Sequence, residues 1–138
     1  MHVKAYIAGQ TSQTKQCYQS AIILRTANDK HKTFTLSGNN PDFLPYRKLA
    51  AEAQALLKLA NLLVQYPSLT QVTVISSQAD KLEKLFSKRA SSVLAKTVQA
   101  YIEKVGVRDK LTFEQAPKDE PWLQQAYFKA THQDRKDT

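Results

Sequence analysis

The sequence predicts an α/β fold in which helices flank a five-stranded mixed sheet, made of three antiparallel strands followed by two parallel additions. Three observations support this class. The first third of the chain carries three short apolar segments separated by polar turns, a pattern typical of antiparallel strands. A long segment of helical period follows, and another short apolar segment comes directly after it. Because a long helix joins two strands there, we expect a crossover that places the later strand parallel to the first.

The three N-terminal strands are expected at Val3–Ala8, within Cys17–Thr26 and at Lys32–Ser37. The polar segment Gln10–Gln16 is expected to form the first turn, and Ala27–Lys30 the second. Short polar connections between consecutive strands favour hairpins, so these three strands are predicted to form an antiparallel meander.

The most regular helix is predicted at Tyr46–Val64, with Pro45 in its first turn, where a missing N–H is tolerated. Neither glycine nor proline interrupts this segment. Its apolar positions recur with the helical period: Leu49, Ala53, Leu56, Ala60 and Leu63.

The remaining elements alternate between strands and helices. Strands are predicted at Val72–Ile75 and Leu111–Gln115, and a short helix at Ala79–Phe86. Another helix carries apolar residues at helical spacing and ends at Gly106, which suits a C-cap. The last helix is expected at about Asp119–His132, where two acidic residues suit the positive end of the helix dipole. Its tryptophan, Trp122, is expected to anchor it to the sheet.

The bulk properties predict one cytoplasmic domain. The 138 residues match the usual size of a single domain, expected to span 1–138 with a frayed charged tail at about 133–138. No apolar run is long enough to cross a bilayer, and the first residues enter a strand pattern rather than a signal peptide. The single cysteine, Cys17, fits a reducing compartment.

Four segments, in this element order, resemble the ribonuclease H family. Tyr6–Gln10 is similar to its first strand, Ser20–Leu24 to its second and Lys32–Gly38 to its third. Glu52 lies where the first helix of that family carries a glutamate, and an alanine and a leucine follow at Ala55 and Leu56. The collinearity of these segments over nearly the whole chain implies a ribonuclease H-like fold.

The resemblance also implies a chemistry, two-metal hydrolysis of phosphodiesters, which needs several carboxylates around two divalent ions. The four carboxylate positions of the family correspond here to Ala8, Glu52, Ser77 and Gln124. One carboxylate is retained, and one carboxylate cannot hold two divalent cations. We therefore expect no metal or other cofactor and no hydrolysis by this mechanism, with Mg²⁺ or Mn²⁺ only if a site is rebuilt around Glu52.

Two interpretations of Glu52 stay open at this stage. It could be a retained metal ligand, or a residue near a helix N-terminus that interacts favourably with the dipole. Asp80, Asp119 and Glu120 are the other carboxylates that could rebuild a metal site with it.

The chain is basic, with a formal net charge of +8, which favours association with polyanions such as nucleic acid. The densest basic run is a candidate nucleic-acid-binding surface, although a solvated helix face explains the same pattern. In one continuous helix, its first three members would share a face. The run comprises Lys81, Lys84, Lys88, Arg89 and Lys96.

Three functions follow from the sequence. The preferred one is a catalytically inactive ribonuclease H-like protein that binds an RNA–DNA hybrid or duplex non-specifically through its basic surface. The second is a protein-interaction module, with a protein partner or a second copy of the chain, because a fold does not fix a function. The third is a divalent-metal nuclease whose carboxylate site has moved.

Overall fold

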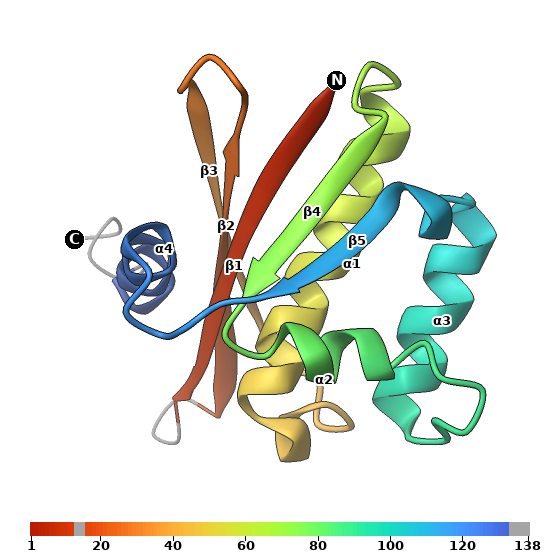
Figure 1. Ribbon diagram of the computed structural model, residues 1–138. Helices are drawn as coiled ribbons and strands as arrows, with labels where there is room; N and C mark the ends of the chain where they lie inside the picture. The colour runs from red at the N-terminus through yellow and green to blue at the C-terminus, as the bar shows by residue number, and fades with distance from the viewer. Residues whose placement is uncertain (13–15, 133–138) are drawn as a thin grey trace.

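The computed structural model describes residues 1–12 and 16–132. The tail predicted at about 133–138 lies outside the described residues. Helices cover both faces of a single sheet, with α1 and α3 on one face and α4 on the other (Figure 1).

The sheet has five strands in the order β3-β2-β1-β4-β5. The pairs β1–β2 and β2–β3 are antiparallel, whereas β1–β4 and β4–β5 are parallel. This confirms the predicted mixed sheet of three antiparallel strands followed by two parallel additions. The strands are β1 (His2–Ser12), β2 (Cys17–Arg25), β3 (His31–Gly38), β4 (Gln71–Ser76) and β5 (Leu111–Gln115).

The described residues also form four α-helices and two short 3₁₀ turns. Gly106 ends α3 in a left-handed conformation, as its position in the sequence predicts. The helices are α1 (Lys48–Gln65), α2 (Ala79–Lys84), α3 (Val93–Val105) and α4 (Pro121–Thr131), and the 3₁₀ turns are Leu44–Tyr46 and Arg108–Lys110.

Three predicted boundaries are wrong. The segment Gln10–Ser12 is strand, not turn, because it continues the ladder with β2, where Gln10 pairs with Gln19. Backbone hydrogen bonds stabilise this polar end of the hairpin, and the pattern of side chains gives no sign of such pairing. At the other boundary, α1 begins at Lys48, because Arg47 has a positive φ of 54° that separates the helix from the preceding 3₁₀ turn.

The third error concerns α2, which ends at Lys84 rather than at Phe86. Lys88 and Arg89 therefore lie in the turn beyond this helix, and Lys96 lies on α3. Only Lys81 and Lys84 can share a helix face, so the predicted single face for the first three lysines is wrong.

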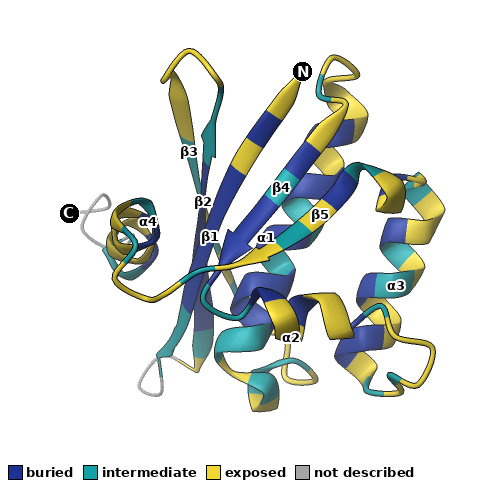
Figure 2. Ribbon diagram, in the orientation of Figure 1, coloured by how far each residue is buried: buried dark blue, intermediate teal, exposed yellow. Residues whose placement is uncertain are grey.

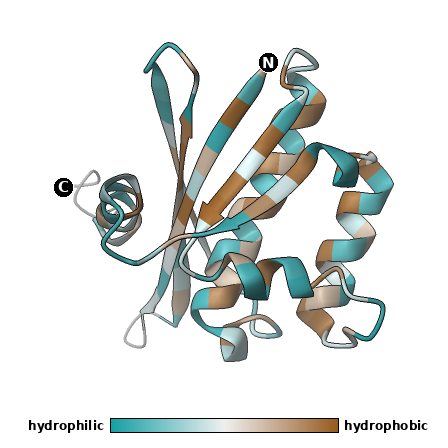
Figure 3. Ribbon diagram, viewed as in Figure 1, coloured by the Kyte–Doolittle hydropathy of each residue, from teal (hydrophilic) through white to brown (hydrophobic). Residues whose placement is uncertain are grey.

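The largest cluster of buried apolar residues joins the sheet to α1 and α3. Buried residues recur along β1, β4 and α1 (Figure 2), and many of these positions are hydrophobic (Figure 3). Strands β1 and β4 alternate faces, as expected of central strands with helices on both sides. Their opposite face carries a smaller cluster that includes Tyr6, Ile23 and Leu123, and Trp122 packs against it. The indole is 6.2 Å from the Tyr6 ring, so Trp122 anchors α4 to the sheet as predicted.

Gly9 sets how closely α1 approaches β1. A Cβ atom at this position would lie 2.6 Å from the Cβ of Ala51, a distance that real side chains do not tolerate. The absence of a side chain therefore lets the first turns of α1 pack directly on the strand. This contact places the N-terminal part of α1 beside Ala8.

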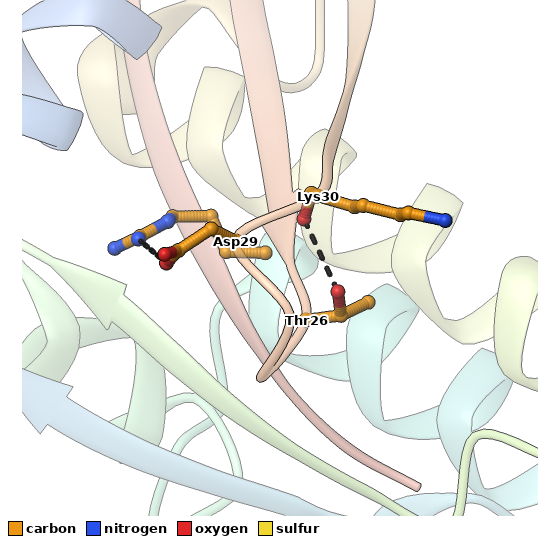
Figure 4. Close-up of polar contacts among 4 residues, drawn as sticks. Thr26, Asp29 and Lys30 are labelled. Carbon is orange, nitrogen blue, oxygen red and sulfur yellow. Dashed lines mark hydrogen bonds and ion pairs between the residues drawn. The ribbon is translucent and has the colours of Figure 1, made fainter.

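At the opposite end of the hairpin, a compact turn joins β2 to β3 (Figure 4). The Arg25 guanidinium pairs with the Asp29 carboxylate at 3.0 Å, and the Thr26 hydroxyl donates to the Lys30 carbonyl at 3.3 Å. The Lys30 side chain extends away from Asp29 (Figure 4).

Among the described residues, none of the helices has the length and apolar character needed to cross a membrane.

Candidate functional site

A pocket of about 330 Å³ opens between the sheet and the helices near the end of β4. Strand β1, the first turn of α1, the segment after β4, the segment before α4 and α4 itself all contribute to it. Its lining residues are Ile7, Ala8, Lys48, Ser77, Lys118, Leu123, Gln124 and Tyr127.

Three of the four positions singled out in the sequence line this pocket: Ala8, Ser77 and Gln124. The Ala8 side chain is nearly buried, with 7% of its surface exposed. Ser77 is half-buried directly after β4, and Gln124 is exposed on α4. Residues more than a hundred positions apart in sequence therefore meet in one hollow, and none of these three carries a carboxylate.

The fourth position, Glu52, is fully buried and does not line the pocket. Its carboxylate accepts hydrogen bonds from the Ser76 hydroxyl and from Nε2 of Gln78, the latter at 2.7 Å. Burial raises the pKa of Glu52, while the hydrogen bonds from Ser76 and Gln78 and the charge of Lys48 oppose that rise. Both carboxylate oxygens are thus engaged, one by the last residue of β4 and the other by the segment that follows the strand.

Lys48, the first residue of α1, lies one helical turn before Glu52 and lines the pocket. It is half-buried, and its ammonium group is 3.5 Å from the Ser77 hydroxyl. Sequence reasoning missed this lysine, although its position four residues before Glu52 places both on one helix face. That spacing was the available signal.

Lys118 reaches the pocket from the segment between β5 and α4 and is exposed. Sequence reasoning missed it too. It lies in an irregular connection after Pro117, where no periodicity indicates which way a side chain points. No signal in the sequence would have placed it.

The segment that carries Ser77 is tied to the last strand. The Gln115 side chain donates to the Ser77 carbonyl and accepts from the Asp80 backbone N–H at 3.1 Å. Since Gln115 ends β5 and Asp80 lies in the first turn of α2, these bonds fix the chain where it leaves β4 and turns into α2.

The remaining candidate carboxylates have other places. Glu120 caps α4, accepting from the backbone N–H groups of Trp122 at 3.1 Å and Leu123 at 3.0 Å. Asp80 and Asp119 are exposed. Within residues 1–12 and 16–132, no three Asp, Glu, His or Cys side chains form a group that could hold a metal ion.

The basic run begins shortly after Ser77, one of the pocket residues, in the sequence. Lys81 follows Ser77 by four residues and is exposed on α2 together with Lys84. Lys88 and Arg89 are exposed in the turn before α3, and Lys96 is exposed in its first turn. These side chains lie around α2 and the start of α3.

Solved structures with the same architecture decide the fold. Ribonuclease H1 from the halophilic archaeon Halobacterium salinarum NRC-1 superposes with a TM-score of 0.66 at 12% identity, over 100% of both chains. A ribonuclease H1 isolated from compost by a metagenomic approach, LC11-RNase H1, was solved in complex with an RNA/DNA hybrid. That structure gives a TM-score of 0.69 at 12% identity, over 96% of this chain and 99% of the other. This chain has the ribonuclease H fold.

The likeness is one of fold, because no protein-family model and no curated protein matches the sequence. The N-terminal ribonuclease H domain of a Mycobacterium tuberculosis protein gives a TM-score of 0.59 at 12% identity, over 96% of this chain and 99% of that one. Function must therefore be argued from this chain's own residues.

The pocket does not fit the divalent metal ions that the ribonuclease H mechanism implies. Mg²⁺ and Mn²⁺ bind oxygen ligands, above all carboxylates. The pocket instead presents the ammonium groups of Lys48 and Lys118, and no carboxylate of residues 1–12 or 16–132 lines it. A cation would meet two positive charges there.

Proposed function

We propose that this protein binds nucleic acid, an RNA–DNA hybrid or duplex, without sequence preference and without hydrolysing it. The observation that carries the proposal is the pocket at Ala8, Ser77 and Gln124, whose lining, among the residues that the structure describes, has two lysines and no carboxylate. That lining favours a polyanion and disfavours the metal ions needed to cleave one.

The charge of the molecule supports binding to a phosphate backbone. The chain carries a net charge of +8, and the basic run around α2 is exposed and begins four residues after Ser77. Lysines that neutralise phosphates release condensed counterions, so the affinity should fall steeply with salt. The compost LC11-RNase H1 that shares this fold was solved with an RNA/DNA hybrid, which makes this ligand the first to test. The cytoplasm is the expected compartment.

The absence of hydrolysis rests on the same positions. Two-metal cleavage needs several converging carboxylates, and of the four positions only Glu52 carries one. Its two oxygens are engaged by Ser76 and Gln78 rather than directed into the pocket.

A fluorescence anisotropy titration with a labelled RNA–DNA hybrid in EDTA tests the proposal. We expect binding at low salt and a linear loss of log affinity with log salt. The double variant Lys81→Gln, Lys84→Gln should lower the salt slope by about 2, at about 1 per lost phosphate contact. The matched pair Lys30→Gln, Lys32→Gln removes the same charge near the β2–β3 turn, and its slope should change less. If the wild-type protein fails to bind the hybrid at low salt, the proposal is wrong.

A further inference from the structure

The polar side chains that line the pocket are mostly hydrogen-bond donors or can act as donors. Lys48 and Lys118 carry ammonium groups, Ser77 carries a hydroxyl and Gln124 an amide. The hydroxyl of Tyr127 donates to the Gln10 side chain at 3.4 Å. A metal ion needs the opposite, a set of acceptor oxygens. A ligand that suits this pocket therefore has negative charge and several acceptor oxygens.

The Lys48 side chain is held against the pocket wall and does not extend freely into solvent. It begins α1 and is half-buried, with its ammonium group 3.5 Å from the Ser77 hydroxyl. The close packing of Ala51 on Gly9 fixes this end of α1 against β1. The position of the charge is thus set by the fold, which lowers the conformational entropy lost when an anion binds.

The two pocket lysines are not held in ion pairs within the described part of the chain, although Lys48 and Glu52 interact through their charges. Within the residues that the structure describes, neither Lys48 nor Lys118 pairs with a carboxylate at ion-pair distance. The nearest acid along α1, Glu52, is buried and bonds to Ser76 and Gln78. Charged donors that face a partly enclosed hollow give stronger hydrogen bonds to an anion than lysines on an open surface do.

We infer that Lys48 and Lys118 hold a phosphate group in this pocket without a metal ion, the two ammonium groups taking the place of divalent cations. The two ammonium groups would donate hydrogen bonds to the non-bridging phosphate oxygens, and the side chains of Ser77 and Gln124 would be further donors to them. The hollow of about 330 Å³ is far larger than the roughly 10–15 Å³ that holds one water. The inference rests on the proposed function only for the source of the phosphate, which would be the nucleic-acid backbone.

Metal independence separates this pocket from a hydrolytic site. Binding through lysines should be unchanged by EDTA. Added Mg²⁺ should weaken it, because the ion competes for the phosphate and screens the ammonium groups. A site that needs a bridging metal ion would respond in the opposite direction.

The test uses the full chain in EDTA with two probes, inorganic phosphate and a labelled RNA–DNA hybrid. With ¹⁵N-labelled protein, inorganic phosphate should shift the amide resonances of Ala8, Ser77 and Gln124. The double variant Lys48→Gln, Lys118→Gln should lose these shifts. With the hybrid, each single variant should bind roughly 10-fold more weakly, since a hydrogen bond to a charged group contributes about that much.

Lys30→Gln is the control, because it removes one positive charge in the β2–β3 turn, which lies at the other end of the sheet from the end of β4 (Figure 1). It should keep the phosphate-induced shifts and bind the hybrid within about 2-fold of wild type. Thermal unfolding of every variant checks that each is folded. Should Lys48→Gln fail to fold, Lys118→Gln alone decides, because Lys118 is exposed in a connecting segment.

The outcomes separate the inference from the proposed function. If the hybrid binds, but phosphate shifts none of the three amides and the lysine variants bind like Lys30→Gln, the inference is overturned while the proposed function stands. If phosphate shifts the pocket amides but the hybrid does not bind, the proposed function is wrong, and the pocket is a metal-free site for free phosphate. If EDTA abolishes binding of either probe, the inference is wrong.

Discussion

The α1-covered face of the sheet and the pocket beside α4 differ in the residues that form them. Between α1 and the sheet, Ile22, Leu56 and Leu59 are fully buried in one apolar cluster. The pocket shares Ile7 with that cluster, but most of its lining residues are lysines or neutral polar residues. The apolar face specifies the fold, and the pocket contributes little to it. Pocket chemistry can therefore differ from that of other ribonuclease H folds while the architecture is kept.

Helix α1 takes part in both regions. Leu56 and Leu59 fill the apolar face, Lys48 lines the pocket, and Glu52 lies between them as a buried carboxyl group. Substitutions near the middle of α1 should therefore lower the free energy of unfolding, whereas substitutions in its first turn should weaken ligand binding.

The largest expected effect is a loss of stability from Leu56→Ala. Leu56 is completely buried in the apolar cluster, and truncating a buried leucine costs about 2–5 kcal/mol through lost burial and the cavity left behind. Urea denaturation measures this loss, with Val64→Ala, an exposed position on the same helix, as the control. Hybrid affinity should stay within about 2-fold of wild type where the variant is folded. A loss below about 1 kcal/mol would contradict the assignment of fold stability to this face.

A smaller effect that reaches both regions is expected from Gly9→Ala. The new Cβ would lie 2.6 Å from the Ala51 Cβ, so α1 must shift, at a cost of about 1–3 kcal/mol for overpacking. Because Lys48 begins this helix, the shift should also weaken hybrid binding.

Gly106→Ala is the matched control for Gly9→Ala. A Cβ at Gly106 meets no atom within 4 Å, but the residue has a φ of +71°, so the substitution should cost about 1 kcal/mol through backbone strain alone. Hybrid binding should be unchanged. If the two glycine variants weaken binding equally, α1 packing does not position the pocket.

At any single pH, Glu52→Gln is expected to change the free energy of unfolding least. Its diagnostic value lies in how that change depends on pH. Burial raises the pKa of Glu52 above its ordinary value of 4.5. Below about 4.5, both the folded and the unfolded chain keep this proton, and the group contributes nothing to the pH dependence. As the pH rises, the unfolded chain loses the proton first, so the free energy of unfolding falls until the folded pKa is passed.

Glu52→Gln should remove this fall, so the variant gains stability relative to wild type as the pH rises from acid toward neutral. Urea denaturation at a series of pH values measures the difference. Glu103→Gln, on the exposed face of α3, removes the same charge and supplies the baseline. If the variant and wild type keep a constant difference at every pH, the Glu52 carboxyl group is not held in a desolvated site.

The antiparallel meander and the parallel direction of β4 follow from residue patterns, because hairpins and a helical crossover leave few choices of topology. The place of β5 was implied only by the resemblance to the ribonuclease H family. The boundaries that were wrong depend on backbone events that side chains do not encode. The pairing of Gln10 with Gln19 extends β1, and the positive φ of Arg47 delays α1. Side-chain patterning therefore predicts elements better than their ends.

For the candidate site, the sequence could place some of the lining positions but not all of the side chains that meet there. Positions Ala8, Ser77 and Gln124 could be placed by element order, since each follows or occupies a well-marked strand or helix. Lys48 was accessible through its spacing from Glu52. Lys118 was not, since an irregular segment carries it into the pocket. The direction of the Glu52 carboxylate depends on Ser76 and Gln78, contacts that no periodicity reveals.

The most direct test of the central claim measures binding and cleavage in the same sample. A hybrid with an end-labelled RNA strand is incubated with an excess of protein in Mg²⁺ or Mn²⁺, and anisotropy and a denaturing gel are read together. The account predicts bound hybrid with its RNA strand intact. Metal-dependent cleavage that Glu52→Gln abolishes would contradict it, because Glu52 would then serve a functional metal site.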